Sequence, residues 1–441
     1  MSEPPDSGRP STRATNRRQV LAWALWDCGS TGLNAIAVTF VFNIYLTDTV
    51  ADDLPSDTSP SVWLGVALFV AGLAIAVFAP VTGIWVDAEW RRRRMLAALT
   101  GVSVLLTASM YLIRDDYRYF VAGLILLAVT SACTELATVP YNAMLRQLST
   151  PQTSGRVSGF GWGMGYLGTV VLLLLIYAGF TSGDGDTRGL LDIPAAEGQN
   201  VRAALLLTAV WFGLFAVPVL VAVPSGARPP DAGLQRIGFI GAYRKLWSEV
   251  LGEWRRDRHV VYYLLASAVF RDGLAGIFTF GALLGVSVYG VSGADILLFG
   301  VAANVVAGIG AVLGGFLDDR LGSKAVIVGS LAAMVVAGTT LMTLSGVLAF
   351  WICGLLLCLF IGPSQSSART LMLHLSAEGK EGIAFGLYTT TGRAVSFLAP
   401  SLFAAFVYAF GTDRAGMAGL CVVLFAGLLA MLAVRVPHRP N

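Results

Sequence analysis

Long apolar segments alternate with short polar segments along almost the whole chain. At 1.5 Å per residue of helix, about 20 apolar residues are enough to cross a hydrocarbon core of roughly 30 Å. Twelve segments reach this length, at residues 20–47, 61–86, 94–113, 118–147, 157–180, 201–223, 259–289, 293–317, 324–344, 348–373, 382–410 and 413–436. The pattern predicts an all-α integral membrane protein with twelve transmembrane helices.

The composition supports this class. Hydrophobic residues make up 56% of the chain and charged residues only 13%, with a mean hydropathy of +0.71, well outside the range of soluble domains. All five cysteines lie in apolar segments and form no CxxC pair, so we interpret them as small core residues. The three histidines are too scattered for a metal site. We therefore expect no cofactor, no metal and no nucleic-acid partner.

Basic residues are distributed unequally between the two sides of the membrane. One side would hold Arg17, Arg18, the run Arg91 to Arg94, Arg146, Arg156, Arg320, Lys324, Lys380 and Arg435. The other side would hold only Arg114, Arg118, Arg188, Arg202 and Arg414. Because loops rich in arginine and lysine stay in the cytoplasm, both termini are predicted to be cytoplasmic, in a plasma (inner) membrane.

The chain divides into two groups of six spans. We expect a disordered tail at 1–19, an N-terminal six-helix bundle at 20–223, a linker at 224–258, a C-terminal bundle at 259–436 and a short tail at 437–441. In the linker, apolar residues recur at three- and four-residue steps: Ile237, Ile240, Tyr243, Trp247 and Trp254. This spacing predicts an amphipathic helix on the inner leaflet, acting as a connector or as a regulatory site.

The same short signal lies between the second and third spans of each half. The first copy is Gly83-Ile-Trp-Val-Asp87, followed by Arg91. The second copy contains Gly315, Asp319, Arg320, Gly322 and Lys324. Glycine permits tight turns and close helix approach, and the aspartate can accept from a helix N-terminus or from an arginine across the interface. Two parallel halves with matching signals are typical of transporters built from internal repeats.

These loops resemble the signature of the major facilitator superfamily, Gly-x-x-x-Asp-Arg-x-Gly-Arg/Lys-Arg/Lys. The second copy fits well, whereas the first has Ala88 and Trp90 in place of the arginine and the second glycine. The resemblance implies the major facilitator fold, in which spans one, four, seven and ten line a central cavity between two six-helix bundles.

Four further stretches, in order, narrow the resemblance: ALWDCGSTGLNAIAVTFVFNIYL, VPYNAMLRQLSTPQTSGRVSGFGWGMGYLG, FRDGLAGIFTFGALLG and GPSQSSARTLMLHLSAEGKEGIAFGLYTTTGRAVSFLAPSLF. From about Val20 to Gly411 the chain resembles the autophagy-related vacuolar amino-acid effluxers, also called the unknown major facilitator family. Members of that family usually have Tyr-Asp-Trp-Ala-Asn-Ser in the first span. This chain has Trp26-Asp27-Cys28-Gly29-Ser30-Thr31, which keeps the aspartate but lacks the tryptophan and the asparagine.

Charged residues inside the predicted spans are the candidates for function. They are Asp27, Glu135, Arg271, Asp272, Arg369 and Arg393. At about 3 kcal/mol for each charge near a helix centre, the six would cost about 18 kcal/mol, more than the net stability of about 5–15 kcal/mol of a typical domain. Pairing, water or protonation must therefore offset them. Asn34 shares a helix face with Asp27, and Asn142 shares one with Glu135.

These residues predict a secondary transporter that moves a small polar or zwitterionic solute, for example an amino acid or a peptide, by alternating access. Arg271 and Arg393 would hold a carboxylate through forked donors. Asp27, Glu135 or Asp272 would bind an amino group or a coupling proton. Asn34 and Asn142 would add neutral hydrogen bonds. The expected partners are this solute, H⁺ and the bilayer, with the protein as a monomer.

Several alternatives remain open. The charges can be structural ion pairs that set helix register, and Arg369 lies close enough to the cytoplasmic end to extend into water. An exporter of drugs, lipids or glycolipids is a second hypothesis, and a non-transporting membrane sensor is a third. An enzyme ranks last, because no HExxH site is present and Ser, His and acidic positions do not cluster.

Overall fold

The computed structural model describes residues 16–55, 57–183, 185–226, 238–256 and 258–436. Most of the predicted tail at 1–19, the tail at 437–441 and Ile237 of the linker lie outside the described residues. Within them, twelve helices are long and apolar enough to cross a membrane, which confirms the prediction. They are Arg17–Val50, Pro60–Val86, Glu89–Leu112, Tyr117–Leu148, Ser154–Thr181, Ala196–Ala222, Arg258–Ser287, Asp295–Leu321, Ser323–Thr343, Val347–Leu375, Glu381–Phe410 and Asp413–Ala433.

The first six spans form the N-terminal bundle. Its elements are α1 (Arg17–Asn34) with η1 (Ala35–Phe40), α2 (Phe42–Ile44) and η2 (Tyr45–Val50), then α3 (Pro60–Val86), α4 (Glu89–Ser109) with η3 (Met110–Leu112), η4 (Tyr117–Tyr119), α5 (Phe120–Ala143), α6 (Leu145–Leu148), α7 (Ser154–Ile176) with η5 (Tyr177–Thr181), η6 (Ala196–Gly198) and α8 (Gln199–Ala222). Between the fifth and sixth spans, β1 (Thr187–Arg188) and β2 (Ile193–Pro194) pair antiparallel, with Thr187 opposite Pro194.

The last six spans form the C-terminal bundle. Its elements are α10 (Arg258–Ser287), α11 (Gly293–Leu321), α12 (Ser323–Thr343), α13 (Val347–Leu375), α14 (Glu381–Val395), α15 (Leu398–Phe410) and α16 (Asp413–Ala433). Helix α9 (Phe239–Arg256) lies between the bundles in sequence, within the predicted linker. The eleventh span is broken after Val395 and continues as α15.

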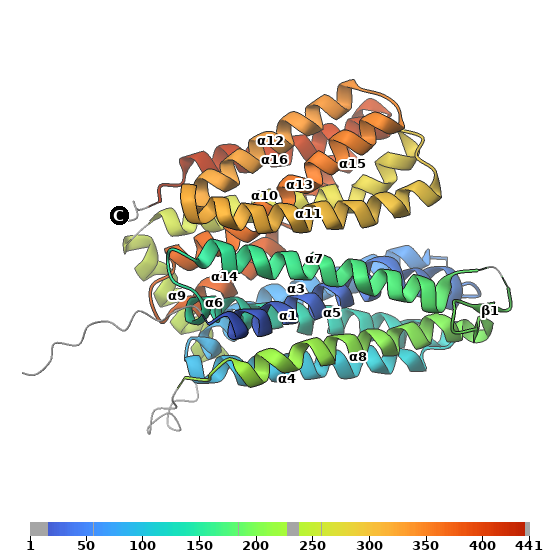
Figure 1. Cartoon of the computed structure of the whole chain (residues 1–441), viewed down its shortest axis with the longest axis horizontal. Helices are drawn as coiled ribbons and strands as arrows, with labels where there is room; N and C mark the ends of the chain where they lie inside the picture. The colour runs from blue at the N-terminus through green and yellow to red at the C-terminus, as the bar shows by residue number, and fades with distance from the viewer. Residues whose placement is uncertain (1–15, 56, 184, 227–237, 257, 437–441) are drawn as a thin grey trace, which may run out of the picture.

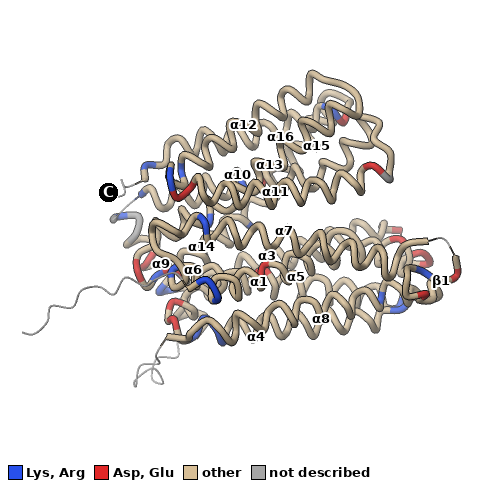
Figure 2. Tube along the Cα trace, viewed as in Figure 1, with Lys and Arg blue, Asp and Glu red and all other residues tan. Residues whose placement is uncertain are grey.

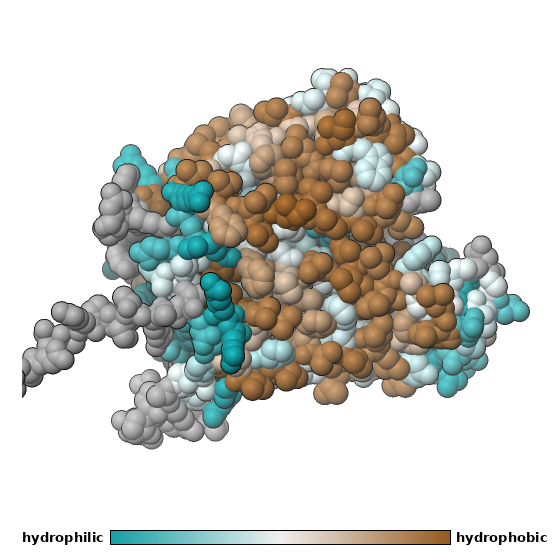
Figure 3. Space-filling view, in the orientation of Figure 1, coloured by the Kyte–Doolittle hydropathy of each residue, from teal (hydrophilic) through white to brown (hydrophobic). Residues whose placement is uncertain are grey.

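The surface explains why the chain needs a membrane. Large apolar side chains are exposed along the spans, for example Phe69, Leu105, Val121 and Ile352. The face of the molecule in Figure 3 is broadly apolar between its two ends. Charged residues gather mainly at the two ends of the molecule (Figure 2). Such an apolar surface is stable against lipid, where helices satisfy their own backbone hydrogen bonds.

The two bundles meet along two helix pairs, α3 with α14 and α7 with α11. We call the end at which α1 begins and α16 ends the basal end, and the opposite end the distal end. In Figure 1 the ribbons of the two bundles converge toward the basal end and diverge toward the distal end. Among the described residues, the ion pairs that join the bundles lie at the basal end or near mid-membrane. The basal side of the interface is therefore closed.

Glycines allow the α3–α14 contact. A Cβ on Gly83 would overlap the carbonyl oxygen of Gly382, so the two backbones touch directly. Three residues before Gly83, Pro80 has no N–H for the carbonyl of Ala76. The hydroxyl of Thr390 on α14 donates to that carbonyl at 3.2 Å. This interruption of α3 is thus satisfied by the opposite bundle.

Candidate functional site

Near mid-membrane, Glu135 and Arg393 form an ion pair between the bundles. Nη2 of Arg393 on α14 lies 2.9 Å from Oε2 of Glu135 on α5, and the side chains are 34% and 28% exposed. Arg271 on α10 lies beside this pair, because its Nη1 approaches the backbone of Gly392, the residue before Arg393. The pair is therefore reachable by a small solute.

Arg271 is held by Tyr388 of α14. Its guanidinium carbon lies 3.9 Å from the ring centroid of Tyr388, and its Nη1 donates to the Tyr388 carbonyl at 3.1 Å. Stacking leaves the outer edge of a guanidinium free to donate elsewhere. Arg271 on α10 and Arg393 on α14 thus place two guanidinium groups close together on neighbouring helices.

A second charge pair joins Asp27 on α1 to Arg369 on α13. Nη1 of Arg369 lies 3.1 Å from Oδ2 of Asp27 and 3.3 Å from the side-chain oxygen of Asn142. The other nitrogens donate to Ser158, with Nε 2.9 Å from its hydroxyl and Nη2 2.7 Å from its carbonyl. Asp27 is 14% exposed and Arg369 only 4%. The pair is nearly sealed, so Arg369 does not extend to the basal surface.

Aromatic side chains surround Arg369. Its guanidinium carbon lies 4.8 Å from the ring of Trp23, 5.6 Å from that of Trp162 and 5.7 Å from that of Tyr141. A Cβ on Gly161 of α7 would lie 2.9 Å from Nη2 of Arg369, so this glycine leaves the space that the guanidinium fills. The cluster therefore depends on small residues of α7 as well as on the charges.

Asp272 caps the helix that follows the break in the eleventh span. Its Oδ2 accepts a hydrogen bond from the backbone N–H of Ala399 at 2.5 Å, in the first turn of α15. A carboxylate stabilises a helix N-terminus because the first N–H groups there lack intrahelical partners. Arg271 and Asp272 are adjacent in sequence but contact different neighbours, Tyr388 and Ala399. Asn34 is exposed at the end of α1, and no contact places it in either cluster.

In each of the two repeated loop signals, the aspartate accepts a hydrogen bond at the N-terminus of a helix in the other bundle. Oδ1 of Asp87, which follows α3, accepts from the N–H of Ile383 in the first turn of α14 at 3.0 Å. Asp319 near the end of α11 accepts from the N–H of Gly155 at 2.8 Å and from Nε of Arg156 at 2.6 Å. Each aspartate thus links its own bundle to a helix of the other.

The remaining residues of these signals have separate positions. Gly315 packs against the backbone of Gly155. Gly322 has a φ of +88°, a conformation that favours glycine. Arg320 is exposed, and Arg91 lies over the ring of Trp90, with its guanidinium carbon 4.7 Å from the centroid.

Three basal residues that sequence reasoning missed form a buried network. The guanidinium of Arg92 is buried, with Nη2 2.8 Å from Oε2 of Glu381 and Nη1 3.0 Å from the carbonyl of Ala143. Nε of Arg146 lies 2.5 Å from Oε1 of the same Glu381. The signal was present in the arginine run, but four identical residues in a row do not show which one faces inward. We call Asp87, Arg92, Arg146, Arg156, Asp319 and Glu381 the basal gate.

The carboxyl of Asp87, in the basal gate, has a raised pKa. Burial raises the pKa of its carboxyl to about 7, while the hydrogen bond from Ile383 and the positive charges of Lys245 and Arg92 act in the opposite direction. The negative charge of Glu381 adds to the increase. The gate therefore contains a carboxyl whose protonation changes near neutral pH.

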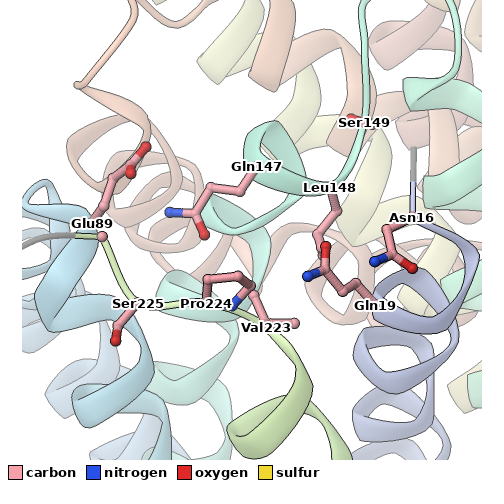
Figure 4. A pocket seen from close by; sticks show the side chains of 10 residues that line it. Asn16, Gln19, Glu89, Gln147, Leu148, Ser149, Val223, Pro224 and Ser225 are labelled. Carbon is pink, nitrogen blue, oxygen red and sulfur yellow. The ribbon is translucent and has the colours of Figure 1, made fainter. Parts of the chain in front are cut away.

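A separate pocket of about 410 Å³ lies at the basal end of the N-terminal bundle (Figure 4). It is lined mainly by polar side chains, including Asn16, Gln19, Glu89, Gln147 and Ser149. None of the six membrane charges lines it. The pocket is thus distinct from the two charge pairs.

Comparison with protein families identifies the chain. Residues 56–440 match the family described as "Vacuole effluxer Atg22 like". The chain belongs to this family. It is 21% identical to the uncharacterized MFS-type transporter YxiO of Bacillus subtilis over 420 residues, which cover 95% of each chain. It is 26% identical to autophagy-related protein 22 of Cryptococcus neoformans over 307 residues, covering 65% of this chain and 52% of that protein.

Solved structures confirm the major facilitator fold. The proton:xylose symporter XylE superposes with a TM-score of 0.72 at 14% identity, covering 94% of each chain. The fucose:proton symporter FucP of E. coli superposes with a TM-score of 0.71 at 13% identity, covering 95% of this chain and 98% of that one. The family and the fold together make this protein a secondary transporter of the major facilitator superfamily, not an enzyme.

Proposed function

We propose that this transporter carries a small zwitterionic solute, such as an amino acid, and exchanges it for a proton or moves it together with one. The observation that carries the proposal is the accessible pair of Glu135 and Arg393, which joins the two bundles with Arg271 beside it. Opposite charges on opposite bundles match a solute that carries both charges.

A zwitterion solves an energetic problem that a singly charged solute would create. Separating a partly buried ion pair without replacing both partners leaves two charges that water does not fully solvate. A solute carboxylate bound to Arg393 and Arg271, with its ammonium bound to Glu135, would replace both partners at once. The solute would then bridge the bundles in place of the direct pair, as alternating access around a shared site requires.

The pair of Asp27 and Arg369 is the proposed coupling site. It lies closer to the basal end than Glu135, because Arg369 also bonds to Asn142, which follows Glu135 on α5 toward the basal end of that helix. Protonated Asp27 would lose its charge and hold Arg369 less firmly, which would loosen the contact between α1 and α13. Asp272 is proposed as a positioning residue for α15, since its carboxylate is occupied by the backbone of Ala399.

The basal end is proposed to face the cytoplasm, with the protein a monomer in the plasma membrane. The support is the concentration of arginines at this end, including Arg92, Arg146 and Arg156 of the basal gate. The related fungal proteins are autophagy-related, and their vacuolar family description makes efflux the direction to test first.

The decisive experiment is counterflow of labelled amino acids, dipeptides, sugars and lipids into proteoliposomes, with and without an imposed pH gradient. We expect flux of an amino acid, reduced roughly tenfold or more in Glu135→Gln and in Arg393→Gln, since each loses a charge-assisted hydrogen bond. Glu378→Gln is the matched control, because Glu378 is exposed. Asp27→Asn should retain exchange but lose its response to the pH gradient. Unchanged flux in the Glu135 and Arg393 variants, or flux of apolar compounds alone, would overturn the proposal.

A further inference from the structure

Helix α9 presents two apolar faces, and only one of them is covered by the protein. The covered face includes Ala242 and Leu246, which are buried against Val81 and Ile84 of α3 and Ile383 of α14. On the opposite face, Ile240 is 80% exposed and Trp247 is 68% exposed, with Leu251 also exposed. This second face is therefore left for a partner outside the bundle.

The position of α9 shows which partner that is. The hydroxyl of Tyr243 donates to the carbonyl of Val77 on α3 at 2.6 Å, and the rings of Phe239 and Phe78 lie 5.7 Å apart. Val77 precedes the end of α3 at Val86 by nine residues, which is roughly 14 Å along a helix. The start of α9 thus reaches the depth of the lipid-facing part of α3, and its exposed face adjoins the bilayer.

Arginines complete this exposed face. Arg244 and Arg255 are exposed and lie on the same side of α9 as Ile240. Counted from Ile240, Arg244, Trp247, Leu251 and Arg255 follow after four, seven, eleven and fifteen residues. These steps place all five side chains within a narrow stripe of the helix, and none of the five is acidic. Tryptophan and apolar residues between arginines are typical of helices that lie in an anionic membrane surface.

The covered face of α9 packs near the basal gate, in a cluster with residues of both bundles. Leu246 belongs to a buried cluster that also contains Val81 and Ile84 of α3, in the N-terminal bundle, and Ile383 of α14, in the C-terminal bundle. Nζ of Lys380, which precedes α14, lies 2.5 Å from Oε2 of Glu249. Separation of the basal ends of α3 and α14 would therefore disrupt contacts that α9 makes at this end.

We propose that the stripe formed by Ile240, Arg244, Trp247, Leu251 and Arg255 binds anionic phospholipid headgroups and thereby stabilises the closed basal gate. The packing of the covered face orients the stripe toward the bilayer, so lipid binds better when α9 is docked. By linkage, lipid that binds the docked state better must also favour docking. Anionic lipid would then shift the transporter toward the state that is closed at the basal end.

The test uses the full-length protein in nanodiscs and needs no transported solute, so it is independent of the proposed function. Spin labels at Glu89→Cys and Glu378→Cys, both exposed positions on opposite bundles, report the basal separation. The background replaces the five native cysteines with alanine or serine. Distances are measured in phosphatidylcholine alone and in phosphatidylcholine with one third phosphatidylglycerol.

We expect the short-distance population to increase at least twofold with phosphatidylglycerol and this increase to shrink at high salt. The double variant Arg244→Gln/Arg255→Gln should lose the increase. Arg94→Gln/Arg320→Gln is the matched control, because it removes the same charge from exposed positions on α4 and α11, and it should keep the increase. An equal distance distribution in both lipids would overturn the proposal. A lipid response that persists in the Arg244→Gln/Arg255→Gln variant would also overturn the proposal. Unchanged thermal unfolding in detergent shows that each variant is folded.

Discussion

Arg369 on α13 donates to Asp27 on α1 at 3.1 Å, across the interface between bundles and over a sequence separation of 342 residues. In the described part of the chain, four further ion pairs join the bundles. Three of them belong to the basal gate, and the fourth, Glu135–Arg393, is more exposed. The Asp27–Arg369 pair is therefore the sealed link between the accessible pair at mid-membrane and the basal gate.

Removing the charge of Asp27 should destabilise the protein strongly. In Asp27→Asn, Arg369 stays buried among Trp23, Tyr141 and Trp162 without its counter-ion. We expect a loss of about 3 kcal/mol, since breaking a buried pair costs about 3–5 kcal/mol. Thermal unfolding in detergent measures it. The double variant Asp27→Asn/Arg369→Met should recover part of the loss, and a single variant as stable as the parent would contradict the expected burial.

A side chain at Gly83 should prevent the basal gate from closing. In Gly83→Val, the new side chain would overlap the carbonyl of Gly382, so α3 and α14 must separate. We expect faster modification of a cysteine placed at Ile383, which is buried between the bundles. Gly72→Val is the control on the same helix, because nothing lies within 4 Å of its Cβ position. Equal modification rates in the two variants would show that the close approach does not control the gate.

Adjacent arginines should differ sharply in importance. Arg92 is buried and bonded to Glu381, whereas Arg91 lies over Trp90. In Arg92→Gln, Oε2 of the buried Glu381 loses its ion-pair partner, while Oε1 keeps Arg146 and the N–H of Gly379. We expect a loss of about 2 kcal/mol or more, in the range for a buried charged group that loses a partner. Arg91→Gln should change stability by less than about 0.5 kcal/mol. Thermal unfolding of the two variants side by side tests this, and equal losses would contradict the burial of Arg92.

Closure of the basal gate should depend on pH through Asp87. Its pKa is raised to about 7 in the closed gate, whereas a hydrated aspartate titrates near about 4. At pH values between these two pKa values, the closed state binds more protons than the open state. The equilibrium constant for closure therefore falls as pH rises from about 4 to about 7, by at most roughly tenfold per pH unit. Above about 7 the effect is constant.

Distances between the Glu89 and Glu378 labels, measured across this pH range, check the dependence. The charges that face Asp87 are those of Lys245, Arg92 and Glu381. Asp87→Asn should keep the hydrogen bond from Ile383 and remove most of the pH response. A response of the same size in Asp87→Asn would assign it to another group.

Much of this protein follows from local sequence. A span needs only about 20 apolar residues, so twelve spans could be counted without any tertiary information. The repeated signals around Asp87 and Asp319 indicated two matching halves. The sequence also indicated that each aspartate accepts from a helix N-terminus or from an arginine across the interface. The structure shows bonds from the N–H groups of Ile383 and Gly155 and, at Asp319, from Arg156 as well.

The choice of partners could not be predicted in the same way. Six charges in the spans required compensation, but which carboxylate meets which arginine depends on how helices far apart in sequence pack. Only the tertiary structure decided that Asp27 meets Arg369 and that Glu135 meets Arg393. Likewise, the period of α9 predicted one apolar face, whereas the fold buries some of its apolar residues against α3 and leaves others exposed. The sequence by itself determined where the chain crosses the membrane, because that depends on neighbouring residues; the fold decided the pairing of charges, because that depends on contacts between distant ones.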